Sequence, residues 1–162
     1  MNSPKWLKDI IAFAFYTGMR RNEILNLKWA DLNLKDKYLF VRNTDEFATK
    51  NKKDRIIPLH KKVLAILKNI SIVSEYVFVT DSKRQHYPNY VTQSFKDLVR
   101  RGKIKKPICF HSLRHSCASN LVSKGASLYN VMQLLGHTDY STTQIYAHLE
   151  RASLAETIKL FD

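Results

Sequence analysis

Apolar side chains near the start of the chain recur three or four positions apart, which predicts a helix that buries one stripe. The stripe consists of Leu7, Ile10, Ile11, Ala14 and Phe15. Ser3 is expected to cap this helix, Pro4 suits its first turn, and Thr17-Gly18 ends it. A second helix is predicted from Arg20 to Leu27, followed by an exit turn at Trp29 to Leu32.

Short runs of β-branched and aromatic residues follow the second helix. They lie at Tyr38 to Val41, near Phe47 to Thr49, and at Arg55 to Pro58. Their length and composition predict a small antiparallel sheet. A further run, Tyr76 to Val79, predicts one more short extended segment.

Helical spacing returns in the remainder of the chain. It involves Val63, Leu64 and Leu67, and then Val91, Phe95, Leu98 and Val99, with Pro88 at a suitable helix start. Three more helices are expected over residues 111–124, 127–135 and 141–148, separated by Gly125 and Gly136. We see no repeat or linker, so residues 1–162 are predicted to form one mainly α domain with a small antiparallel sheet, an α+β fold.

The last segment, from Glu150, has apolar residues on one face of a predicted helix: Leu154, Ile158 and Phe161. Two interpretations stay open for this stripe. It either packs on its own domain or docks on a neighbouring copy of the chain.

The chain is strongly basic: 27 Lys and Arg against 14 Asp and Glu give a net charge of +13. Between Leu98 and Thr138 there are seven Lys or Arg and no acidic residue. Such an excess favours a nucleic-acid partner, although a ribosomal or histone-like protein would share it. We expect this stretch to face phosphate.

The two cysteines, Cys109 and Cys117, show no paired spacing, so neither a disulfide framework nor a cysteine zinc site is predicted. Cys117 is expected to be a small core residue. No apolar run approaches the roughly 18 residues of a membrane span, and the first residues lack the apolar core of a signal peptide. A cytoplasmic protein is therefore predicted.

Metal chemistry finds little support in the sequence. The acidic residues are scattered and form no pair of the D-x-D kind that holds two cations. His111 and His115 have zinc-ligand spacing, but Ser112 stands where a metalloprotease carries glutamate. His60-Lys61-Lys62 suggests a phosphodiesterase motif, yet Leu67 occupies the position of the acid that such a motif needs.

Several short motifs remain, and each carries a cation, an imidazole or a phenol. In chain order they are Thr17-Gly18-Met19-Arg20 with Glu23 three residues later, Leu27-Lys28-Trp29-Ala30-Asp31, Thr49-Lys50 ahead of Arg55-Ile56-Ile57-Pro58-Leu59, His111-Ser112-Leu113-Arg114-His115, Leu134-Leu135-Gly136-His137, and Tyr146 nine residues after His137. Together they extend from about residue 12 to 149. This ordered set resembles the catalytic domain of tyrosine recombinases, the phage integrase family.

The resemblance implies the fold of that catalytic domain and a site-specific DNA recombinase or integrase. Such an enzyme cuts and rejoins DNA through a 3′-phosphotyrosyl link, without metal, ATP or another cofactor. Tyr146 is implied to be the nucleophile and Lys50 the general acid, while Arg20 and Arg114 clamp the phosphate. His111 is implied to bind the phosphate and assist Tyr146, His137 to donate a further hydrogen bond, and Glu23 to orient Arg20. These residue types suit phosphoryl transfer, which requires a nucleophile, stabilised oxygens and a protonated leaving group.

Some positions have local competitors. Lys52 and Lys53 lie close to Lys50, and Tyr140 is close to Tyr146, but only Lys50 and Tyr146 have the family offsets. His115 and His148 are expected to make structural hydrogen bonds, and we leave both out of the catalytic set.

The implied partner is double-stranded DNA, bound by a homotetramer whose isolated catalytic domain is a monomer. Family members usually carry an N-terminal core-binding domain, and its absence here leads us to expect a fragment. A bacterial or phage-encoded, nucleoid-associated protein of a mobile element is expected. Two alternatives stay open: relaxation of DNA by a type IB topoisomerase, and a catalytically silent DNA-binding module of the same fold.

Overall fold

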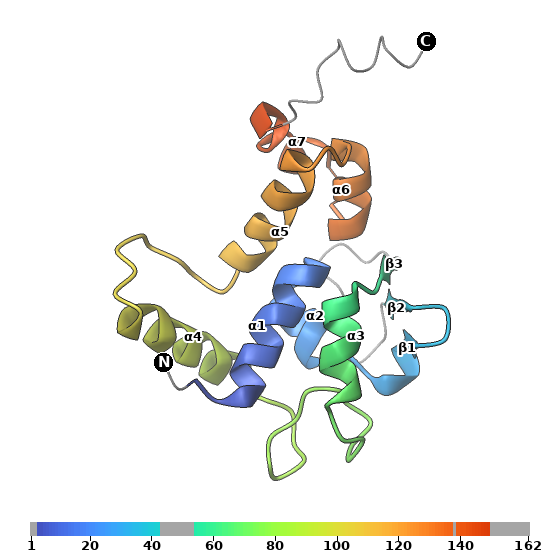
Figure 1. The fold of residues 1–162 in the computed structure, drawn as a ribbon, viewed down its shortest axis with the longest axis vertical. Helices are drawn as coiled ribbons and strands as arrows, with labels where there is room; N and C mark the ends of the chain where they lie inside the picture. Colours follow the sequence, from blue (N-terminus) through green and yellow to red (C-terminus); the bar gives the residue numbers. More distant parts are fainter. Residues whose placement is uncertain (1–2, 43–53, 138, 150–162) are drawn as a thin grey trace.

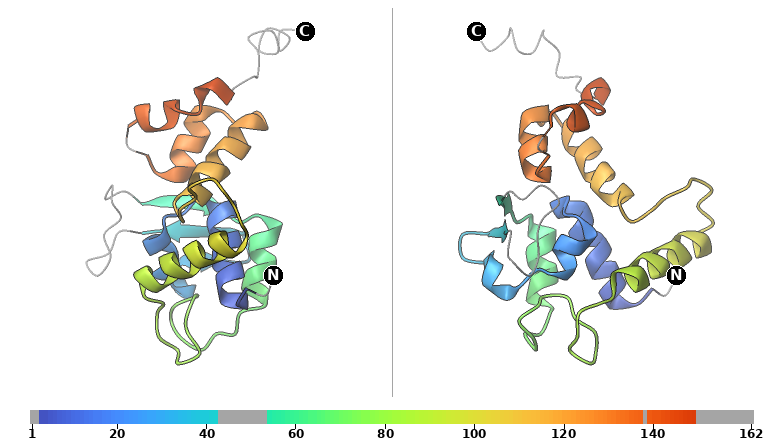
Figure 2. Two further views of the ribbon diagram at one scale, coloured as in Figure 1. Left: turned by 90° about the vertical axis from the view of Figure 1, so that its left-hand side faces the viewer. Right: turned by 180° about the vertical axis from the view of Figure 1, so that it is seen from behind.

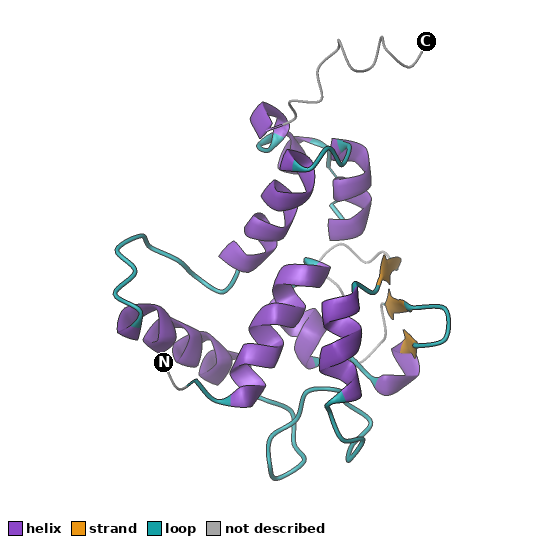
Figure 3. Cartoon of the chain, viewed as in Figure 1, coloured by secondary structure: helices purple, strands orange, loops and turns teal. Residues whose placement is uncertain are grey.

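The computed structural model describes residues 3–42, 54–137 and 139–149, and within these ranges it is mainly helical (Figures 1 and 3). Its α-helices are α1 (Lys5–Thr17), α2 (Arg21–Leu25), α3 (Lys61–Lys68), α4 (Pro88–Arg101), α5 (Ser112–Ser123), α6 (Leu128–Leu135) and α7 (Ser141–Gln144). Two 3₁₀ helices, η1 (Trp29–Asp31) and η2 (Ala147–Leu149), complete the helical part. The predicted α+β class is confirmed.

The sheet has three short antiparallel strands in the order β1-β2-β3: β1 (Leu32–Asn33), β2 (Tyr38–Val41) and β3 (Arg55–Pro58). The register pairs Tyr38 with Pro58 and Val41 with Arg55. Arg55 therefore begins β3 beside the end of β2. The strand predicted near Phe47 to Thr49, and Lys50 with it, lies outside the described residues.

The main core surrounds α1, whose side chains Leu7, Ile10 and Phe13 are fully buried. Figures 1 and 2 show α1 between α3 and α4, while α5, α6 and α7 stand together at its C-terminal end. A second, smaller core lies within that upper group and consists of Ala118, Val122, Leu128, Val131, Leu135 and Tyr146. The end of α1 thus meets the base of the second group.

Gly18 allows the end of α1 to lie close to α5 and α6. It ends α1 in the left-handed region, with φ of 66°, and its backbone N–H donates to the oxygen of Ala14. A Cβ at this position would lie 2.6 Å from Cδ2 of Leu135 and 3.3 Å from Sγ of Cys117. Glycine is therefore required here both by the backbone and by the close approach of α5 and α6.

Two predicted boundaries are wrong in detail. Pro4, not Ser3, holds the N-cap of α1, and no side-chain bond caps that end. Arg20 is the N-cap of α2 and has extended backbone angles, and the helix ends at Leu25. The segment Tyr76 to Val79, predicted to be a short extended piece, makes isolated antiparallel bridges that pair Tyr76 with Lys28 and Val79 with Gln85.

The helix predicted over residues 141–148 is also wrong, because it breaks between α7 and η2. The N–H of Tyr146 bonds to the oxygen of Thr143 at 3.0 Å, and the N–H of Leu149 bonds to the oxygen of Tyr146 at 2.9 Å. These are the i to i−3 bonds of tight turns. The turn buries the Tyr146 ring in the small core and leaves Ile145 exposed.

Replacing Gly18 with alanine should destabilise the fold, because the new methyl group meets Leu135 and the backbone stays left-handed. We expect a loss of about 2–4 kcal/mol in the free energy of unfolding, measured by urea denaturation. Gly125→Ala is the matched control, since Gly125 has φ of 89° but no described atom lies within 4 Å of the place its methyl group would occupy. It should lose only the backbone part, about 1–2 kcal/mol, and equal losses in the two variants would contradict the steric argument.

Candidate active site

Glu23 lies at the centre of the first group of candidate residues and is only 3% exposed. Its carboxylate accepts the backbone N–H of Arg20 at 2.8 Å and the Nη1 of Arg20 at 3.0 Å. Arg55 of β3 donates Nη2 and Nη1 to the same carboxylate, at 2.6 and 3.1 Å. Burial alone would raise the pKa of Glu23, but the bonds and charge of Arg55, with those of Arg20, lower it below the ordinary value of 4.5.

Arg55 also joins β3 to the end of α6. Its Nε donates to the backbone oxygen of Leu134 at 3.0 Å. Gly136 has φ of 67°, and a Cβ there would lie 2.9 Å from Cδ of Arg55. The Arg55 side chain therefore packs directly against the turn that presents His137.

Arg114 of α5 is 3% exposed and spans two backbone segments. Its Nη1 donates to the oxygen of Gly18 at 2.8 Å, and its Nη2 donates to the oxygen of Leu135 at 2.6 Å. Burial first, and then repulsion from Arg20, lowers the pKa of Arg114 to about 9, against the opposing attraction of Glu23. The guanidinium therefore remains charged at neutral pH.

His137 follows Gly136, and its Nδ1 lies 2.8 Å from Oγ1 of Thr143, a buried residue of α7. Burial lowers the pKa of His137 to about 4, and the positive charges of Arg114 and Arg20 act in the same direction. The imidazole is therefore neutral at pH 7 and holds one ring proton.

Tyr146 is 5% exposed, and its hydroxyl lies 2.5 Å from Nδ1 of His115. The ring of His115 is in turn 4.9 Å from the ring of His111, with the two planes nearly perpendicular at 84°. Burial raises the pKa of Tyr146, although the charge of Arg114 acts in the opposite direction. The phenol is thus protonated at neutral pH and already hydrogen-bonded.

The structure brings most of the predicted site residues into one region. Arg20, Glu23, Arg114, His137 and Tyr146 are linked through shared hydrogen bonds or charge interactions, and His111 adjoins them through His115. The expected contact between Glu23 and Arg20 is present. Lys50 lies outside the described residues.

Two neighbours of this region were not among the predicted site residues. In the sequence, Arg55 was named only as part of a motif and was given no role in the site. The signal that could have identified it is a charged residue at the start of an otherwise apolar strand. His115 was expected to make a structural hydrogen bond. It makes one, but its partner is the oxygen of Tyr146.

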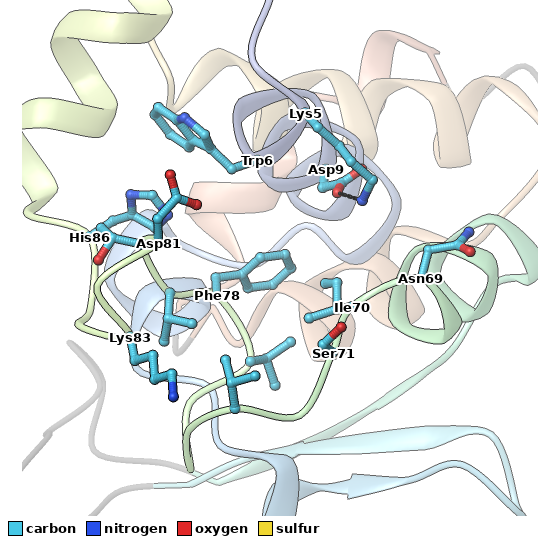
Figure 4. A pocket seen from close by; sticks show the side chains of 14 residues that line it. Lys5, Trp6, Asp9, Asn69, Ile70, Ser71, Phe78, Asp81, Lys83 and His86 are labelled. Carbon is cyan, nitrogen blue, oxygen red and sulfur yellow. Dashed lines mark hydrogen bonds and ion pairs between the residues drawn. The ribbon is translucent and has the colours of Figure 1, made fainter.

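A separate pocket of about 510 Å³ lies away from these residues, where the start of α1, the exit of α3 and residues 77–86 meet (Figure 4). His86 is 4% exposed there and stacks on Trp6, with ring centroids 4.5 Å apart. Burial lowers the pKa of His86, while a backbone hydrogen bond with Val79 and the charge of Asp81 act in the opposite direction. None of the candidate residues lines this pocket.

Comparison with known proteins shows the family to which the chain is similar. A sequence model of the phage integrase family matches residues 1–153. A tyrosine recombinase of Thermosipho africanus is 36% identical over 154 residues, which cover 94% of this chain and 53% of that protein. Tyrosine recombinase XerD of Listeria innocua is 32% identical over 177 residues, covering 99% of this chain and 56% of XerD.

Solved structures share the fold. The XerA recombinase structure superposes with a TM-score of 0.70 at 27% identity, covering 99% of this chain and 64% of that one. A lambda integrase dimer bound to a COC′ core site gives 0.72 at 25% identity, covering 86% of this chain and 53% of that one. The chain belongs to the phage integrase family. It spans about half the length of the curated relatives it matches.

Removing the Arg55 side chain should destabilise the protein strongly, because Glu23 would keep its buried charge with half its partners. For Arg55→Met we expect a loss of about 3–5 kcal/mol in the free energy of unfolding, measured by urea denaturation. Arg100→Met removes an exposed arginine paired with Asp97 and should change the same quantity by less than about 1 kcal/mol. A loss for Arg55→Met as small as the control would contradict the buried-pair assignment.

The lowered pKa of Glu23 should make stability depend on acid. A carboxyl whose folded-state pKa is depressed stabilises the fold above its unfolded value, and this contribution is lost as pH falls through the folded value. The unfolding free energy of the wild-type chain should therefore decline as the pH falls below about 4.5. Glu23→Gln should flatten part of that decline in a urea denaturation series between about pH 3 and 6. An unchanged slope would contradict the assignment.

Proposed function

We propose that this chain is the catalytic domain of a site-specific DNA recombinase that cuts and rejoins strands through a covalent phosphotyrosyl link. The observation that carries the proposal is the placement of the Tyr146 hydroxyl beside His115 and near the charge of Arg114, in the same region as Arg20 and His137. A phenol in a region where positive charge exceeds negative charge suits attack on a phosphodiester, since the developing negative charge meets fixed positive charge. The relatives named as tyrosine recombinases support the same activity.

Arg20 and Arg114 bind the non-bridging oxygens of the scissile phosphate in this proposal. Glu23 fixes the side chain of Arg20, and the carbonyls of Gly18 and Leu135 fix that of Arg114. Each terminal nitrogen of Arg114 carries two hydrogens, so a second N–H remains on each for phosphate. Rigid guanidinium forks lose little entropy when they bind, which favours them over lysines for this task.

His137 acts as a hydrogen-bond donor. With Nδ1 accepting from the hydroxyl of Thr143, the ring proton resides on Nε2 and points to another acceptor. The low pKa of about 4 keeps this proton arrangement over the physiological range. His111, the N-cap residue of α5, also binds the phosphate in this proposal.

The chemical step forms a bond between phosphorus and Oη of Tyr146 and breaks the bond between phosphorus and O5′. Lys50 gives a proton to the departing O5′, which leaves as a hydroxyl. The 3′-phosphotyrosyl link preserves the energy of the broken bond. A 5′ hydroxyl from another strand can therefore reverse the step and rejoin the DNA, without a cofactor.

Double-stranded DNA is the proposed partner, and the net charge of +13 supports it. A lambda integrase of the same fold is seen as a dimer on a core site. We propose a homotetramer on DNA and a monomer away from it. Among the described residues, no helix is both long and apolar enough to pass through a membrane. The proposed location is the cytoplasm, in association with the nucleoid.

The test is to trap the covalent adduct on nicked duplex oligonucleotides whose arms have randomised sequences. We expect a protein–DNA band that survives detergent with the wild-type chain and is absent for Tyr146→Phe, because the nucleophile is gone. Tyr140→Phe is the matched control, since Tyr140 is a nearby tyrosine that is 47% exposed, and it should keep the wild-type rate.

The outcomes separate the alternatives. Retarded DNA without a covalent band would replace the enzyme with a silent DNA-binding module. An adduct that also relaxes supercoiled plasmid, but exchanges no strands between duplexes, would indicate a topoisomerase instead.

A further inference from the structure

His115 occupies a position on α5 that the proposed chemistry has not used. It follows Arg114 directly and stands one helical turn after His111, so the three side chains emerge on adjoining parts of one helix. Its Nδ1 is 2.5 Å from the hydroxyl oxygen of Tyr146, the atom proposed to attack phosphorus. A short bond to the reacting atom distinguishes His115 from the other histidines described above.

The Tyr146 ring is held firmly enough to make this contact meaningful. The ring belongs to the small core with Val131 and Leu135, and the backbone N–H is bonded to Thr143. The partner helix α5 is anchored in turn by the two carbonyl bonds of Arg114. Both ends of the hydrogen bond are therefore fixed by structure other than the bond itself.

A buried phenol needs a proton acceptor when it attacks phosphorus, because its oxygen cannot bond fully while it retains hydrogen. The groups around the Tyr146 oxygen limit which side chain can accept its proton. Arg114 carries no lone pair, and the thiol of Cys117 is itself held protonated, because burial raises its pKa to about 11. His137 is engaged with Thr143 through Nδ1. His115 presents a ring nitrogen directly to the hydroxyl.

We propose that His115 is a catalytic residue that accepts the proton of Tyr146, an inference that rests on the proposed function. As the bond between Oη and phosphorus forms, the hydroxyl proton passes to Nδ1 of His115, and the electron pair of the O–H bond becomes the new bond to phosphorus. The bond to O5′ breaks, and the leaving oxygen takes its proton from a separate acid. On rejoining, the imidazolium returns the proton as Tyr146 leaves.

The assignment gives separate tasks to His115 of α5 and to His111, the N-cap residue of that helix. His115 serves the nucleophile, while His111, whose ring meets that of His115 edge to face at 4.9 Å, serves the phosphate. The sequence resemblance implied that His111 assists Tyr146. The contact at Tyr146 assigns proton transfer to His115 instead.

Two substitutions separate proton transfer from mere positioning. His115→Phe keeps the ring shape and removes both functions, whereas His115→Asn places an amide near Nδ1 that can hold the phenol but cannot take its proton. The substrate is the nicked duplex that the wild-type chain cleaves among those with randomised arms. The rate of its single-turnover cleavage should fall about 10²- to 10⁴-fold in both variants. His148→Phe, two residues beyond Tyr146, is the matched control and should cleave at the wild-type rate. Thermal denaturation of each variant verifies folding.

A more acidic nucleophile provides the second measurement. Fluorinated tyrosine incorporated at position 146 loses its proton more readily, so it should recover most of the cleavage rate in the His115→Phe background. A purely structural role for His115 would show no such recovery. Full activity of His115→Asn, or failure of the fluorinated phenol to recover any rate, would overturn the proton-acceptor role.

The failure of this inference differs from failure of the proposed function. Without an adduct from the wild-type chain, the recombinase proposal and the role of His115 fall together. A wild-type adduct that forms equally fast in His115→Phe and His115→Asn removes only the role of His115.

Discussion

The buried guanidinium of Arg114 is the interaction on which the arrangement of the site depends. A charge this deep is unfavourable unless hydrogen bonds and opposite charge compensate it. Two backbone carbonyls, from Gly18 and Leu135, and the carboxylate of Glu23 provide that compensation. Gly18 stands two residues before Arg20, and Leu135 stands two residues before His137. By bonding to both carbonyls, the Arg114 side chain sets the positions of Arg20 and His137 relative to its own guanidinium. Gly18 permits this only because it has no side chain to meet Leu135.

The local elements could be predicted because their signals are local. The apolar stripe of α1, the runs of β2 and β3, and the short motifs around Arg20 and His137 each lie within a few residues. The pairing of Arg55 with Glu23 joins residues 32 positions apart, and that of His115 with Tyr146 joins residues 31 apart. Neither pairing produces a periodic pattern in the sequence. The break after α7 was missed for a similar reason, because the Tyr146 ring packs with residues of α5 and α6 that the local pattern does not indicate.

Positive charge exceeds negative charge in the site, and this imbalance adds to burial, the larger cause, in lowering the pKa values of Arg114 and His137. Arg114 and His137 are both harder to protonate than their free counterparts, partly because each is repelled by Arg20. Glu23 is committed to Arg20 and Arg55 and neutralises only part of the excess. An anion placed among these groups would raise both pKa values and relieve the repulsion. The excess positive charge of the site therefore favours the binding of an anion.

The break between α7 and η2 has a mechanical consequence. Tyr146 stands between a four-residue helix and a three-residue 3₁₀ turn, and its backbone N–H and C=O are bonded to Thr143 and Leu149. The hydroxyl of Tyr146 is therefore positioned by the packing of its ring in the small core and not by a continuous helix.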